Sequence, residues 1–192
     1  MAQAATREHI EYAKCVADAA YFADAYCQID EPQGADRSVI PFRLWAAQVQ
    51  LLWTLLIEKR VIILKARQLG ISWLLCAYAL ALCLFQRGRV VLAFSRGQSE
   101  ADELIRRVRV MHERLPGWLK AISAKLIKPN TSDLEWSNGS RMESFPATKG
   151  AGRSLTASLL IMDEFAWMQF ATEVYTAAKP TVDNGGQLVI LS

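Results

Sequence analysis

VIILKARQLGIS, residues 61–72, is the stretch of this sequence that decides its expected fold. The first four residues are apolar and mostly β-branched, a composition typical of a strand buried on both faces of a parallel sheet. The loop KARQLG follows, and the apolar run from Ile71 to about Gln86 is long enough for a helix. The stretch therefore predicts a strand, a loop and a helix in direct succession.

Strand-like and helix-like segments continue to alternate toward the C-terminus. Buried strands are predicted at Val90–Phe94, Leu159–Met162 and Leu188–Leu191, with helices at Gln98–Leu115 and near Phe170–Ala178. Asn138-Gly139 indicates a hairpin between Leu134–Trp136 and Arg141–Phe145. The alternation predicts an α/β fold: a doubly wound, mainly parallel sheet with helices on both of its faces.

Helical segments are expected before this region. Residues 6–29 carry apolar side chains three to four positions apart, and EPQGADRS, residues 31–38, has the composition of a turn. Pro41 then opens a second helical stretch, Phe42–Glu58. We therefore divide the chain into an N-terminal helical extension, residues 1–40, and a core, residues 41–192, interpreted as minimal or truncated because it stops at a strand.

The composition is that of one folded domain, since 52% of the 192 residues are hydrophobic and 21% are charged. A net charge of +3 does not by itself require a nucleic-acid partner. Basic residues do gather in one predicted helix, at Arg106, Arg107, Arg109 and Arg114. They form either a solvated helix face or a DNA-facing patch.

Neither the cysteines nor the apolar runs indicate an oxidising or membrane environment. Cys15, Cys27, Cys76 and Cys83 lack the spacing of a zinc site or a disulfide framework, which fits a reducing cytoplasm. The longest apolar run, Ile71–Phe85, is shorter than the roughly 20 residues of a membrane span, and the N-terminus has no apolar signal region. We expect a soluble intracellular protein.

Lys65–Ser72 matches part of the pattern of a phosphate-binding loop, GxxxxGK followed by Ser or Thr. Gly70 and Ser72 stand at the expected positions, but Ile71 replaces the lysine and Lys65 replaces the first glycine. Because the ends of such a loop lie close together, Lys65 can fold back over the phosphates. The pattern alone is weak. Its position between a strand and a helix N-terminus suits an anion, and an ordinary strand-to-helix turn stays open as the alternative.

Two acids, Asp163 and Glu164, directly follow the predicted strand Leu159–Met162. They emerge at the carboxyl end of a parallel strand, the edge at which ligands bind in such sheets. There Asp163 can hold a magnesium ion, and Glu164 can polarise the water that attacks a γ-phosphate. The alternative is a charged pair that only caps the next helix. The loop and the acids together, in this order, favour an ATPase.

Five segments resemble, in order, the motifs of the ATPase domain of the tailed-bacteriophage terminase large subunit, a DNA-packaging motor. They are IPFRLWAAQ at 40–48, KARQLGIS at 65–72, FPATKGAGRS at 145–154, LLIMDE at 159–164 and LVILS at 188–192. The resemblance runs from about residue 20 to the end of the chain. It implies a RecA-like P-loop NTPase core that hydrolyses ATP with Mg2+ to drive double-stranded DNA into a procapsid.

The resemblance implies which residues bind the nucleotide. Gln48 would hydrogen-bond the adenine, with Phe42 or Trp45 available for stacking. The alternative for Gln48 is a solvated glutamine on a helix. The triphosphate would bind to the loop residues Lys65, Ala66, Arg67, Gln68, Leu69, Gly70, Ile71 and Ser72. Ser72 and Asp163 would hold Mg2+, largely through water.

It also implies the catalytic and coupling residues. Glu164 would activate the attacking water, and Arg67 would stabilise the γ-phosphate within the same subunit. Arg153 would be an arginine finger for the ATP of a neighbouring subunit, unless it is a surface arginine or a DNA contact. Ser192 would begin the motif that couples hydrolysis to movement.

The implied partners are double-stranded DNA, other copies of the chain in a ring, the portal protein and the small terminase subunit. These would meet in the host cell cytoplasm, and the chain is not expected in the mature virion. The nuclease domain usual in this family has no room here, so no DNA cleavage is expected. Two other functions stay open: a helicase-like nucleic-acid-dependent ATPase, and a non-catalytic nucleotide- or DNA-binding module with a degenerate loop, suggested by Ile71.

Overall fold

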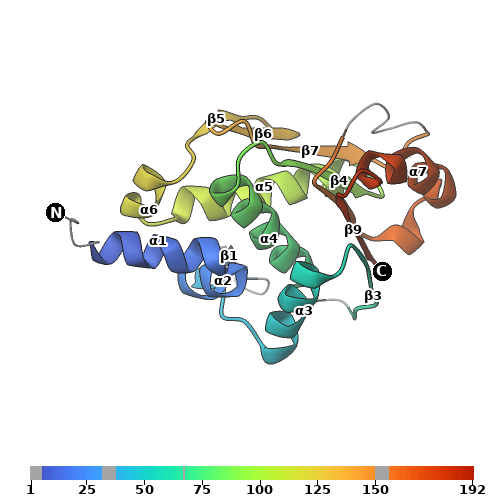
Figure 1. The fold of residues 1–192 in the computed structure, drawn as a ribbon. Helices are drawn as coiled ribbons and strands as arrows, with labels where there is room; N and C mark the ends of the chain where they lie inside the picture. The colour runs from blue at the N-terminus through green and yellow to red at the C-terminus, as the bar shows by residue number, and fades with distance from the viewer. Residues whose placement is uncertain (1–5, 32–37, 67, 150–155) are drawn as a thin grey trace.

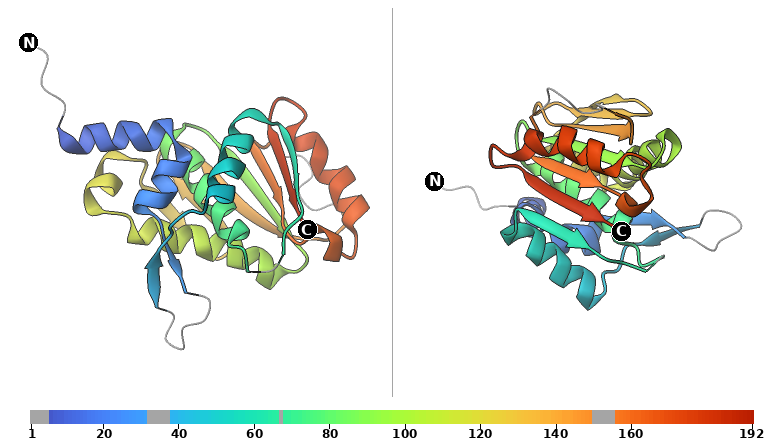
Figure 2. Two further views of the ribbon diagram at one scale, coloured as in Figure 1. Left: turned by 90° about the horizontal axis from the view of Figure 1, so that it is seen from below. Right: turned by 90° about the vertical axis from the view of Figure 1, so that its right-hand side faces the viewer.

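A computed structural model describes residues 6–31, 38–66, 68–149 and 156–192. These residues form a seven-stranded sheet with helices on both sides and a separate two-stranded hairpin (Figure 1). Both views of Figure 2 show this hairpin, made of β1 (Gln28–Asp30) and β2 (Val39–Pro41), standing out from the main body. The predicted α/β class is confirmed.

The large sheet is mostly parallel. Its strand order is β3-β9-β8-β4-β7-β6-β5, and every pair from β3 to β7 is parallel. The bounds are β3 (Arg60–Ile63), β9 (Gln187–Leu191), β8 (Leu159–Met162), β4 (Val90–Ser95), β7 (Arg141–Pro146), β6 (Asp133–Trp136) and β5 (Leu126–Pro129). β7, β6 and β5 pair antiparallel, and β6 and β7 are the hairpin predicted around Asn138-Gly139.

Helices cover both faces of the central strands, which explains why these strands are apolar throughout. On one face, α4 (Ile71–Phe85) and α5 (Gln98–Arg114) share a core with Val91 and Ala93 of β4. On the other, α7 (Ala171–Ala178) and the 3-10 turn η2 (Lys179–Val182) pack on Leu92 and Phe94. Because successive side chains of a strand point to opposite faces, both sets must be apolar.

The N-terminal part differs from the single helix predicted over residues 6–29. Asp18 has an extended backbone, and its carboxylate accepts a hydrogen bond from the Ala20 N–H, so α1 (Arg7–Ala17) ends and α2 (Ala19–Tyr26) begins there. The next predicted helix was also wrong at its start. After Pro41 the chain makes a turn, in which the Arg43 N–H donates to the Pro41 carbonyl, and the Leu44 N–H donates to Asp24; α3 (Ala46–Ile57) begins only afterward.

The prediction that residues 61–64 are buried on both faces was wrong. The exposed fraction of Ile62 is 72% and that of Leu64 is 84%. Among the described residues β3 pairs only with β9, so it is an edge strand with one open side. An apolar sequence indicates that a strand can be buried, but the order of the strands in the sheet decides whether it is a central strand or an edge strand. The pattern also missed several short elements, among them β1, β2, β5 and α6 (Gly117–Ile122).

Two of the α5 arginines, Arg106 and Arg114, are engaged within the fold. Arg106 Nη1 lies 2.9 Å from Asp30 Oδ2, and Arg114 Nη2 lies 2.8 Å from Asp30 Oδ1. Arg106 and Arg107 also pair with Glu103. Much of the positive charge of these arginines is therefore neutralised within the chain. The ion pairs with Asp30 also connect β1 to α5.

The four cysteines pack in the interior of the protein. Cys15, Cys27, Cys76 and Cys83 are buried free thiols, and burial raises the pKa of Cys76 to about 12. They therefore serve as small apolar side chains. In the part of the chain that the structure describes, no helix combines the length and apolar character needed to cross a membrane.

His112 of α5 makes stability depend on pH. It is buried near the Trp136 ring, and burial lowers its pKa to about 4. The unfolded chain binds this proton near pH 6.5, so its contribution to folding stability falls as pH drops from about 6.5 to about 4. We expect His112→Phe to flatten this decline in urea denaturation series. The same substitution at exposed His9 should leave it unchanged, and an equally steep decline in both variants would contradict the assignment.

Candidate functional site

The candidate site lies where the central parallel strands end. Lys65 follows β3, Arg96 follows β4, Asp163 follows β8 and Ser192 follows β9, so all four lie at the carboxyl edge of the sheet. In Figure 1 the C-terminus lies beside the loop after β3. Residues from four separate parts of the sequence meet here, as expected for the ligand-binding edge of an open α/β sheet.

Asp163 joins the two predicted motifs. Its exposed fraction is only 6%, and its Oδ2 accepts a 2.7 Å hydrogen bond from the Ser72 hydroxyl at the start of α4. Its Oδ1 accepts from the Glu164 N–H at 2.9 Å and lies 4.0 Å from Lys65 Nζ. A hydroxyl, a carboxylate and an ammonium group therefore converge, and the side-chain oxygens of Ser72 and Asp163 are hard ligands of the kind that Mg2+ prefers.

Glu164 has an unusual backbone and a basic neighbour. Its φ of 56° and ψ of 37° are left-handed, a conformation that non-glycine residues rarely adopt outside tight turns and functional sites. The turn leads into the 3-10 segment η1 (Phe165–Trp167). Arg96 Nε lies 3.2 Å from Glu164 Oε2, and Arg96 also pairs with Glu100 at 2.6 Å. These two carboxylates raise the pKa of Arg96, the Glu100 hydrogen bond most strongly.

The loop between β3 and α4 turns sharply at its end. Gln68 has a φ of 64° and Gly70 a φ of 70°, and Gly70 precedes the first turn of α4. A Cβ on Gly70 would lie 3.0 Å from Gln48 Nε2, so the position favours glycine for both conformation and space. The helix start also presents backbone N–H groups without intrahelical partners, which suit an anion.

Gln48 is buried against this loop and is not a solvated helix residue. Its Oε1 accepts from the Trp45 N–H and its Nε2 donates to the Leu69 carbonyl, both at 3.0 Å. The exposed fraction of Gln48 is 4%, whereas that of Trp45 is 61%. Gln48 therefore holds the start of α3 against the end of the loop.

Ser192 connects the loop to the acid-bearing turn. Its N–H donates to the Ile63 carbonyl, and its own carbonyl accepts from the Lys65 N–H at 2.8 Å. Its hydroxyl accepts from the Ala166 N–H at 3.2 Å. A displacement of Lys65 or of η1 would therefore strain the hydrogen bonds of Ser192, the position predicted to begin the coupling motif.

Two cavities meet at this edge. The loop cavity, about 490 Å³, is lined by residues of β2, α3 and the loop, among them Phe42, Gln48, Lys65 and Gly70. The acid cavity, about 320 Å³, is lined by Asp163, Glu164 and residues of α5, among them Glu100 and Glu103. Ser72 and Arg107 line both, so the two cavities adjoin at these residues.

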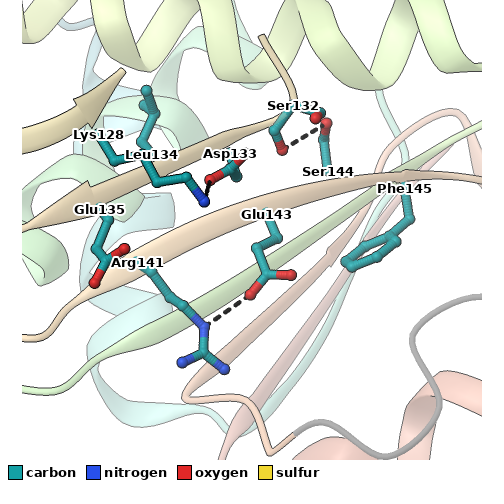
Figure 3. A pocket seen from close by; sticks show the side chains of 9 residues that line it. All are labelled: Lys128, Ser132, Asp133, Leu134, Glu135, Arg141, Glu143, Ser144 and Phe145. Carbon is teal, nitrogen blue, oxygen red and sulfur yellow. Dashed lines mark hydrogen bonds and ion pairs between the residues drawn. The ribbon is translucent and has the colours of Figure 1, made fainter. Parts of the chain in front are cut away.

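A third cavity lies at the other end of the sheet, on β6 and β7 (Figure 3). Four of its charged side chains form two ion pairs: Lys128 Nζ lies 2.6 Å from Asp133 Oδ2, and Arg141 Nε lies 2.7 Å from Glu143 Oε1. In the strand order β6 and β7 lie beyond β4, and this cavity shares no lining residue with the loop cavity or the acid cavity.

The structure brings together most of the residues predicted from sequence. The loop cavity and acid cavity include, among the predicted positions, Gln48, Lys65, Gln68, Leu69, Gly70, Ile71, Ser72, Asp163 and Glu164. Arg67 and Arg153 lie outside the described residues. Sequence reasoning missed Arg96 and Arg107. The position of Arg96 just after a predicted strand was a usable signal, whereas nothing in the sequence indicated that Arg107 faces Ser72.

Comparisons with known proteins agree on one family. The family model described as "Terminase large subunit, T4likevirus-type, N-terminal" matches residues 62–191. The HK97 bacteriophage large terminase has a similar fold, with a TM-score of 0.69 and 17% identity over 92% of this chain and 37% of that chain. The Thermus phage P74-26 large terminase ATPase domain has a TM-score of 0.62 and 20% identity, over 79% of this chain and 65% of that chain. The large terminase of a thermophilic bacteriophage has a TM-score of 0.59 and 12% identity, over 76% of this chain and 38% of that chain.

Gln48→Ala should lower the free energy of unfolding. The substitution removes one acceptor and one donor that make partly buried hydrogen bonds to backbone groups, and each such loss costs about 0.5–1.5 kcal/mol. Gln50→Ala, on an exposed position of the same helix, is the matched control and should change stability little. Urea denaturation of the two variants measures the difference, and equal stabilities would show that Gln48 does not hold the loop.

Proposed function

The chain belongs to the terminase large-subunit family, of which it carries the N-terminal, ATPase-domain part, and we propose that it hydrolyses ATP to move double-stranded DNA into a procapsid. The chain spans 37% of the HK97 terminase and 65% of the P74-26 ATPase domain. The observation that carries the proposal is the 2.7 Å contact between the Ser72 hydroxyl and Asp163, with Lys65 beside it. It supports a RecA-like P-loop arrangement in which the loop and the acids serve one ligand.

In this proposal the triphosphate binds over the loop, residues 65–72. The backbone N–H groups at the start of α4 favour its negative charge, and Lys65 supplies a cation from the opposite end of the loop. Lys65 lines the loop cavity and lies within 4.0 Å of Asp163, which supports the idea that it replaces the lysine missing at Ile71. The adenine would occupy the part of the loop cavity near Phe42.

The donor set fits a magnesium ion bound with the triphosphate. Mg2+ usually takes one or two protein oxygens, with phosphate oxygens and water as its other ligands. Ser72 and Asp163 offer that pair, and among the described residues no group of three or more His, Cys, Asp or Glu forms a protein-only metal cage. When bound, the ion would neutralise charge on the phosphates.

Glu164 would act as the general base. Its carboxylate would accept a proton from water as the water oxygen attacks the γ-phosphorus and the bond to the β–γ bridging oxygen breaks, which yields ADP and phosphate. Glu164 has a left-handed backbone and begins the turn into η1, whereas Asp163 accepts the Ser72 hydroxyl, and we assign the two acids different tasks. Arg96 would hold the Glu164 carboxylate between turnovers.

The remaining roles are proposed from family membership. Gln48 keeps one N–H and one lone pair for an adenine beyond the two hydrogen bonds it makes to backbone groups. Arg67 would act within the subunit and Arg153 on a neighbour in a ring. Ser192 would transmit a shift between the loop and η1. Double-stranded DNA, the portal protein and the small terminase subunit are the proposed partners, in the host cell cytoplasm.

Glu164→Gln should abolish turnover while preserving binding. The amide keeps the shape of the side chain but accepts no proton, and loss of a general base typically lowers turnover about 100- to 10,000-fold. Phosphate release measures turnover and titration calorimetry measures ATP affinity, which should stay within about threefold because no binding group is removed. Glu173→Gln, at an exposed position of α7, is the control. Unchanged phosphate release in Glu164→Gln would refute the catalytic proposal.

Lys65→Ala should weaken ATP binding far more than Ile71→Ala. Removal of a charged donor to phosphate costs about 1.5–3 kcal/mol, whereas Ile71 would contribute only its backbone N–H, which alanine retains. Calorimetric dissociation constants of both variants provide the measurement, with exposed Lys59→Ala as a control for loss of charge. Equal or reversed effects would mean that Lys65 is not the phosphate-binding cation.

A further inference from the structure

Helix α5 contributes one arginine to the junction of the two cavities. Arg107 and Ser72 line both the loop cavity and the acid cavity. Ser72 lies at the start of α4, whereas Arg107 lies in the middle of α5. A ligand that extends from Gln48 in the loop cavity toward Glu164 in the acid cavity must therefore pass this junction.

Two contacts hold the Arg107 side chain there. Its guanidinium carbon lies 5.1 Å from the centroid of the Trp73 ring, a cation–π distance, and Trp73 follows Ser72 directly. Its Nε donates to Glu103 Oε1 at 3.1 Å. The side chain is 24% exposed, and within the described ranges Nε is its only hydrogen-bonded nitrogen. The two terminal nitrogens thus remain able to donate to a ligand.

The other arginines of α5 do not share this arrangement. Arg106 uses three nitrogens in hydrogen bonds to Glu103 and Asp30. Arg109 lies 4.0 Å from Glu113 and lines neither the loop cavity nor the acid cavity. Arg107 therefore differs from Arg109 in its position at the junction, and from Arg106 in keeping two terminal nitrogens without a hydrogen bond.

Arg107 is the positive charge in the lining of the acid cavity, whose other charged residues are acidic. Four of the residues that line it are acids, Glu100, Glu103, Asp163 and Glu164, and Arg107 is the basic residue among them. Burial would raise the pKa of Glu103, but hydrogen bonds and charges from Arg106 and Arg107 outweigh it, so the pKa is lowered and Glu103 stays ionised. A phosphate that enters beside these carboxylates needs a cation at close range.

We propose that Arg107 binds the terminal phosphate of ATP, so that α5 takes part in distinguishing ATP from ADP. This inference rests on the proposed function of the same site. The planar guanidinium can donate two parallel hydrogen bonds to phosphate oxygens, a geometry that a lysine cannot reproduce. Trp73 and Glu103 orient the group before the nucleotide arrives. ADP, which lacks the phosphate nearest Glu164, gains little from it.

The test compares the dissociation constants of ADP and of an ATP analogue with a β,γ-imido bridge, both with Mg2+, by calorimetry. Arg107→Ala should weaken the analogue about 10- to 100-fold and ADP less than about threefold, since only the analogue carries the phosphate concerned. Arg107→Lys should recover part of the loss. Arg109→Ala, the matched control on the same helix, should bind both nucleotides as the unaltered protein does.

The outcomes separate this inference from the proposed function. If the unaltered protein binds neither nucleotide, the proposed function fails and the role of Arg107 falls with it. If the unaltered protein binds both and Arg107→Ala weakens both equally, or neither, the role of Arg107 is overturned while the nucleotide site stands. Circular dichroism checks folding. Arg107→Gln, which keeps length and hydrogen bonding but not charge, replaces the alanine variant if that variant does not fold.

Discussion

The hydrogen bond from the Ser72 hydroxyl to the Asp163 carboxylate joins residues that are 91 positions apart in the chain. It forms because β3 and β8 end at the same edge of the sheet, with β9 between them. Lys65 approaches the same carboxylate, and Ser192 connects the loop to the turn that carries Glu164. Without this convergence of strand ends the loop and the acids would be two unrelated patterns.

Several acidic and basic side chains lie close together at the carboxyl edge of the sheet, where they form ion pairs. Arg96 pairs with both Glu100 and Glu164. Arg107, at the junction of the two cavities, pairs with Glu103. Interactions between such groups are stronger in a partly buried site than in water. A phosphate would therefore enter a site whose cations are already oriented by carboxylates, so little reorganisation is needed when it binds.

The N-terminal segment is also part of the site's architecture. Ile29 and Pro41, from the β1–β2 hairpin, line the loop cavity. Asp30 binds both Arg106 and Arg114, so α5 holds the hairpin in place. Arg106 and Arg114, which the sequence placed in a possible surface patch, thus hold the hairpin that lines the loop cavity. Their charges are paired with Asp30 within the fold.

The sequence by itself determined the main strands and helices of the core and their order, because apolar period and turn residues are local properties. It identified the strand before Asp163, the hairpin at Asn138-Gly139 and the loop that ends at Gly70. Only the tertiary structure decided that β3 is an edge strand and that Arg107 reaches the loop. These depend on which strands pair and which helix packs beside α4, and such long-range choices leave no local pattern in the chain.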